Sequence, residues 1–145
     1  WSALGVATLA IGALAMGSVV NGLLLGHWYL VTPRLSPRPL TRMTVLLLAA
    51  LALQLATTLG YLALVALGVL APTVATALLQ ENGVVFWLRL AAGLGFSVVL
   101  GVLTLKACKR GAMQAATGLL YVAVGTVGGG ELVGKTLALL TGTPL

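Results

Sequence analysis

The chain has 145 residues, of which 60% are hydrophobic and only 7% are charged, with eight basic and two acidic side chains. Because soluble domains carry about a quarter charged residues, this composition excludes a soluble domain of this size. Most of the chain must lie in lipid, and its length allows one polytopic membrane domain.

Four apolar runs are long enough to cross a membrane as helices, which takes about 20 residues each. We predict an all-α integral membrane protein, a four-transmembrane-helix bundle, in a bacterial-type inner or plasma membrane. The predicted spans are 2–25, 44–70, 84–105 and 112–140.

The first span carries no charge and is followed by His27, Trp28 and Tyr29, with Arg34 nearby. Aromatic rings of this kind are typical of a membrane interface. One interpretation is a site where His27 donates a hydrogen bond to a lipid phosphate or a quinone carbonyl; the alternative is a simple interfacial anchor. Because a single histidine cannot supply both axial ligands of a haem, we expect no cofactor of its own. A quinone or haem shared with a partner chain stays open.

Most of the basic residues lie in two of the connectors between spans. Three arginines and three prolines make 31–42 a stiff basic segment, suited to a soluble cytoplasmic partner or anionic lipid. Six of the eight bases lie in the first and third connectors, whereas the second has none. The positive-inside rule then predicts that both basic connectors are cytoplasmic and both chain ends lie outside. Bases used in this way indicate topology, so we expect no nucleic-acid binding.

Small residues recur at every fourth position of each span, which would place a small-residue stripe on one face of each helix. In lipid, helices associate through close backbone approach at such stripes. Chance matches are the alternative, because glycine and alanine are abundant. The glycines predicted to pack between helices are Gly22, Gly26, Gly60, Gly93, Gly101 and Gly130.

Three charged residues fall inside the spans, where charge is costly and indicates function by default. Glu131 and Lys135 have the spacing and order of an intrahelical ion pair, and Arg89 lies early in the third span. Glu131 lies roughly 28 Å along the fourth span, which predicts a cluster near the outer interface. The cluster is either a polar vestibule for an ion, proton or headgroup, or an ion-paired network joining the last two helices. A glycine run at 128–130 predicts a break in the helix that favours the vestibule.

Two uncharged polar residues, Asn21 and Gln54, lie far from helix ends and need hydrogen-bond partners in hydrocarbon. No catalytic motif or metal-binding cluster is present, so we predict no catalytic residues and no metal.

The leading hypothesis is a non-catalytic accessory or anchor subunit that associates with lipid and with other membrane subunits or itself. Energy-transducing redox assemblies are the first class of complex to test. The alternative is a small homo-oligomeric transporter or channel with Arg89, Glu131 and Lys135 along its pathway. A membrane-embedded lipid enzyme ranks last.

Overall fold

The computed structural model describes residues 3–32, 35–70 and 72–143, and this part of the chain is helical, without strands. It contains four helices long and apolar enough to cross a membrane. These are α1 (Ala3–Val31), α2 (Arg38–Ala66), a composite helix Gly83–Lys109, and α6 (Met113–Thr141). The composite helix consists of α4 (Gly83–Leu88), the π-helix η2 (Arg89–Phe96) and α5 (Ser97–Lys109). The prediction of an all-helical chain with four helices long and apolar enough to span a membrane is confirmed for the described residues.

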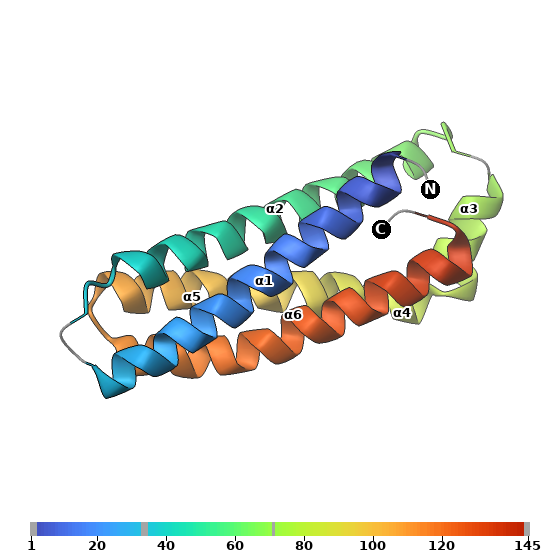
Figure 1. Ribbon diagram of the computed structural model, residues 1–145. Coiled ribbons are helices and arrows are strands. Elements are labelled where there is room, and N and C mark those ends of the chain that lie inside the picture. The colour runs from blue at the N-terminus through green and yellow to red at the C-terminus, as the bar shows by residue number, and fades with distance from the viewer. Residues whose placement is uncertain (1–2, 33–34, 71, 144–145) are drawn as a thin grey trace.

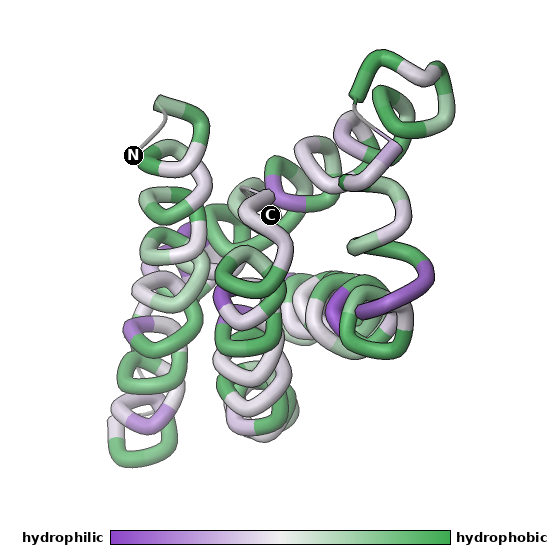
Figure 2. The backbone as a smooth tube through the Cα atoms, turned by 90° about the vertical axis from the view of Figure 1, so that its right-hand side faces the viewer, coloured by the Kyte–Doolittle hydropathy of each residue, from purple (hydrophilic) through white to green (hydrophobic). Residues whose placement is uncertain are grey.

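The four helices pack as a ring. Helix α1 contacts α2 and α6, and α5 contacts the same two helices, so α2 and α6 face each other across the bundle. Both ends of the chain and the short helix α3 (Pro72–Thr76) lie at one end, and the α1–α2 and α5–α6 connections lie at the other (Figure 1). Apolar residues predominate along all four helices, and hydrophilic stretches are few (Figure 2). At the end with the two short connections lie the bases Arg38, Arg42, Lys106, Lys109 and Arg110.

The helices begin and end at residues that differ from the predicted limits. Helix α1 continues through the interfacial aromatics to Val31, and the Thr32 amide extends its hydrogen bonding to the Trp28 carbonyl. Helix α2 begins at Arg38, earlier than predicted, because Pro39 lies in its first turn, where a proline removes no helical hydrogen bond. Gly68 ends α2 early: its positive φ and the Val69 amide bond to the Leu64 carbonyl close the helix.

The segment before the third span is also more ordered than the connector predicted for it. Residues 72–81 form α3 and the π-helix η1 (Ala77–Glu81), and only Asn82 leaves the helical conformation before α4. Leu78 of η1 is buried with Phe86 and Leu137, so this segment covers the end of the bundle. Its apolar side chains pack against that end of the bundle. A connector of polar turn residues would have no apolar side chains to bury.

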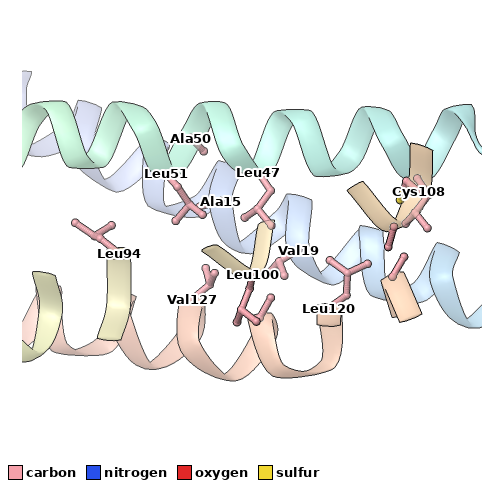
Figure 3. Close-up of a cluster of buried hydrophobic side chains, with 14 of the residues drawn as sticks. Ala15, Val19, Leu47, Ala50, Leu51, Leu94, Leu100, Cys108, Leu120 and Val127 are labelled. Carbon is pink, nitrogen blue, oxygen red and sulfur yellow. The ribbon is translucent and has the colours of Figure 1, made fainter. Parts of the chain in front are cut away.

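The core between the helices is apolar along most of its length. Figure 3 shows side chains from α1, α2, α5 and α6 meeting there, and the buried members include Ala15, Val19, Leu47, Leu100, Leu120 and Val127. Small residues bring the backbones close at defined points. A Cβ added at Gly130 would lie 2.6 Å from the Cα of Gly93, and one added at Gly26 would lie 2.7 Å from the Thr117 hydroxyl. A Cβ added at Gly101 would lie 2.7 Å from Leu48 Cδ2, whereas one added at Gly22 would make only an ordinary contact of 3.6 Å with Leu120.

Gly60 does not pack between helices, contrary to the prediction. It is exposed, and a Cβ added there would have no heavy atom within 4 Å. The inward face of α2 instead carries larger residues, among them Leu47, Leu51 and Gln54. A helix needs small residues only where a neighbouring backbone approaches closely, and α2 packs through side chains.

Candidate intramembrane polar site

Glu131 lies deep in the bundle. It comes 18 residues after the start of α6 and ten before its end, or about 27 Å and 15 Å at the rise of an α-helix. The whole helix is about 43 Å long and exceeds the roughly 30 Å hydrocarbon thickness of a bilayer. With α6 centred on the membrane, Glu131 lies about 6 Å from the middle. If the hydrocarbon instead begins at the first turn of α6, Glu131 lies at the outer interface, and that position stays a prediction.

The partly buried Glu131 carboxylate contacts residues from two other helices. Gln54, which is 5% exposed, donates a hydrogen bond from Nε2 to Glu131 Oε1 at 2.5 Å across the diagonal of the bundle. Gly12 of α1 faces the carboxylate, which occupies the space that a Cβ at position 12 would fill. The need of Gln54 for a partner was predictable, but this partner and the role of Gly12 were not.

Arg89 is the buried cation of the site. It is 5% exposed, and its Nη1 donates a hydrogen bond to the Gly130 carbonyl at 2.5 Å. The guanidinium lies where Gly134 has no side chain, and the Nε atom is buried without a hydrogen-bond partner among the described residues. It is close enough to Glu131 for the two charges to attract each other. Arg89 therefore points into the bundle and does not extend to the headgroups.

The glycine run at 128–130 does not break α6, contrary to the prediction. The helix is continuous from Met113 to Thr141. Gly130 is needed for the contact with Gly93, and Gly128 lies against Met16 of α1, whereas Gly129 has open space beside it. Gly130 therefore serves close helix packing, and the backbone beside Glu131 stays helical.

Lys135 and Asn21 lie on the outside of the bundle, along a groove between α1 and α6. The groove has a volume of about 580 Å³, and Glu131 also lines it. Lys135 is exposed and forms no ion pair with Glu131 or with any other described residue. Asn21 is exposed and donates from Nδ2 to the Gly17 carbonyl of its own helix at 2.8 Å. The residues lining this groove, which we call the α1/α6 groove, are Gly12, Ala13, Met16, Gly17, Val20, Asn21, Gly128, Glu131, Leu132 and Lys135.

The interfacial residues near the end of α1 point in different directions. His27 and Trp28 are exposed, whereas Tyr29 is buried and donates a hydrogen bond from its hydroxyl to the Ser36 carbonyl. Arg34 lies outside the described residues. A pocket of about 380 Å³ is lined by Tyr29, Leu30 and residues 111–115, and His27 does not line it. The structure therefore does not bring His27 and Tyr29 to one site.

Within 3–32, 35–70 and 72–143, no three His, Cys, Asp or Glu residues gather in a group that could hold a metal ion. No protein-family model, curated protein or solved structure matches the chain. Functional inference therefore rests on the buried network around Glu131 and on the α1/α6 groove.

Proposed function

We propose that this chain is a small accessory or anchor subunit of a larger membrane complex, joined laterally to its partners and without a complete catalytic site of its own. The observation that carries the proposal is that the α1/α6 groove presents Asn21, Glu131 and Lys135 on the outside of the bundle. Asn21 lies four residues from the midpoint of α1, about 6 Å along the helix. A polar side chain at that depth is costly without a partner.

Helices associate in lipid through close backbone approach and interhelical hydrogen bonds, and a helix of another chain in the groove would have both. Ala13 and Gly17 of α1 let a backbone approach closely, and the three polar side chains offer interhelical hydrogen bonds. Energy-transducing redox assemblies are the class of complex to examine first, because their subunits share quinone or haem between chains. An absorption spectrum of the purified assembly detects a shared haem.

The proposed test replaces a groove residue and an interior residue in parallel. In nanodiscs, Asn21→Leu should lower the mass of the protein assembly toward that of one chain, 14.7 kDa. The melting temperature of the chain should stay unchanged. Gln54→Leu should lower the melting temperature instead, because it removes the partner of Glu131 inside the bundle. A wild-type chain that is monomeric in nanodiscs at all concentrations, and that also co-purifies with no other membrane protein in mild detergent, would refute the proposal.

The proposed orientation places the basic end in the cytoplasm and both chain ends outside, in a bacterial-type inner or plasma membrane. The described bases gathered at one end support it, since cytoplasmic loops carry an excess of Lys and Arg. Single cysteines at Gly111 and Asn82, in a Cys108→Ala background, test it with an impermeant thiol reagent applied from outside. Labelling at position 82 only is expected, and labelling at position 111 only would reverse the orientation.

A second candidate function is a small homo-oligomeric transporter or channel. Glu131 favours it, because this carboxylate lies deep in the spanning region and also lines the α1/α6 groove. The apolar core that includes Val19, Leu100 and Val127 offers no polar route through a single bundle. A pathway would therefore have to run between chains, past Glu131 and Lys135 in the groove, with Arg89 inside the bundle beside Glu131. Proton flux in proteoliposomes that falls in Glu131→Gln, with assembly retained, would favour this candidate over the first.

A further inference from the structure

We propose that the partner in the α1/α6 groove is the same groove of a second copy of this chain. The two copies form a two-fold symmetric dimer in which Lys135 of each chain pairs with Glu131 of the other. This inference rests on the proposed function, because it names the lateral partner that the groove accepts.

The groove carries one acid, Glu131, and one base, Lys135, so the groove of one copy is complementary in charge to the groove of another. Lys135 is exposed and has no ion pair among the described residues. Glu131 has only its Oε1 atom engaged by Gln54, and its side chain also lines the groove. A partner that fits must therefore bring an acid to Lys135, and it can add a second cation to Glu131, which Arg89 already attracts from inside the bundle. An anionic headgroup would supply the acid alone, whereas a second copy supplies Glu131 to Lys135, Lys135 to Glu131 and an amide to Asn21.

Membrane insertion restricts the symmetry of such a dimer. Two copies inserted in the same direction are related by a two-fold axis along the membrane normal, so equal residues lie at equal depth. Glu131 and Lys135 differ in depth by about 6 Å, a separation that the long, flexible lysine side chain can span. Because the interface is isologous, the Lys135–Glu131 contact is made twice.

Asn21 has a partner in the same arrangement. Its single hydrogen bond to the Gly17 carbonyl leaves the side-chain carbonyl and one N–H without partners among the described residues. Across the axis, the Asn21 amides of the two copies lie at the same depth and can bond to each other. A buried asparagine pair of this kind fixes the register of parallel helices in coiled coils.

The groove also has room for a second backbone. A Cβ added at Gly17 would meet no heavy atom within 4 Å, and Ala13 and Gly17 follow one another at a four-residue spacing on the groove side of α1. Gly17 lies one helical turn from Asn21 on the same face. In the dimer, position 17 therefore lies close to the two-fold axis and close to its symmetry mate.

The first experiment is disulfide cross-linking in native membranes, in a Cys108→Ala background. Gly17→Cys should give a covalent dimer of twice the chain mass on oxidation with copper phenanthroline. The matched control is Gly60→Cys, another exchange into open space, on an exposed face of α2 away from the groove; it should give at least tenfold less dimer. Equal cross-linking at both positions would show random collision and overturn the inference.

The second experiment tests the charge pair. In nanodiscs, Lys135→Gln should raise the dimer dissociation constant about tenfold, consistent with two modest polar contacts in a membrane, and Lys135→Arg should restore it. Glu131→Gln should have the same effect, and the double variant should be no weaker than either single one. A dissociation constant unchanged in Lys135→Gln would overturn the pairing.

The outcomes separate this inference from the proposed function. If Gly17→Cys links only to a different polypeptide, the homodimer is overturned and the accessory function stands. If Gly17→Cys links to nothing, and the chain is monomeric in nanodiscs and co-purifies with no other membrane protein, both are overturned. A dimer linked through position 17 and weakened by Lys135→Gln supports both.

Discussion

The contact between Gly93 and Gly130 makes a sharp prediction about stability. A Cβ at position 130 would lie 2.6 Å from the Gly93 Cα and 3.2 Å from its carbonyl carbon and oxygen. Ordinary carbon–carbon contacts lie at about 3.5–4.0 Å, so Gly130→Ala must separate α6 from η2 by about 1 Å. The obstacle is backbone, which no side-chain rotation relieves.

The neighbouring glycine provides a matched control. A Cβ at Gly129 meets no heavy atom within 4 Å, so Gly129→Ala keeps only the gain in helix propensity, up to about 1 kcal/mol. Gly130→Ala has the same gain and in addition an overpacking cost of about 1–3 kcal/mol. The difference between the two alanine variants is therefore about 1–3 kcal/mol, or about 3–9 °C in melting temperature for a chain of this size.

Cys108 supplies the assay. It is a free thiol, 2% exposed, and the chain has one cysteine. A fluorogenic maleimide should therefore react with it only as the bundle unfolds, and heating in mild detergent gives a melting curve for each variant. Equal melting temperatures for Gly129→Ala and Gly130→Ala would refute the close contact between α6 and η2.

Two further predictions use the same assay. Gln54→Leu leaves the Glu131 carboxylate without its hydrogen bond and should cost about 1–3 kcal/mol; a melting temperature unchanged in Gln54→Leu would contradict this account. Tyr29→Phe removes the hydrogen bond to the Ser36 carbonyl and should cost about 1 kcal/mol, whereas Tyr121→Phe, at an exposed tyrosine, should cost nothing. Equal effects at the two tyrosines would argue against that bond.

The number of spanning helices could be predicted because lipid imposes a simple requirement on length and composition. Which face of each helix points inward could not. Gly60 and Gly130 stand in similar four-residue repeats, yet Gly130 touches Gly93 and Gly60 is exposed. Spacing defines a stripe, but only the position of the neighbouring helix decides whether the stripe is used.

The candidate site was predictable in its members and not in its contacts. Glu131, Arg89 and Lys135 were identified because charge is rare in this chain. Gln54 is the partner of Glu131, and the Gly130 carbonyl is the partner of Arg89. Both contacts arise from the tertiary arrangement of the helices. Lys135, expected beside Glu131 on one helix, lies on the outer surface instead. Sequence spacing gives distances along one helix, and the contacts across the bundle depend on how the helices are rotated.

The bases gathered at one end of the bundle also give the molecule an uneven distribution of positive charge along its long axis. Moving one elementary charge across a potential of 100 mV involves about 2.3 kcal/mol. With the basic end on the negative side of an energised membrane, inverting the bundle would carry Arg38, Arg42, Lys106, Lys109 and Arg110 against that potential, at a cost of about 11 kcal/mol. In that orientation the membrane voltage itself opposes inversion of the inserted chain, and depolarisation removes this contribution.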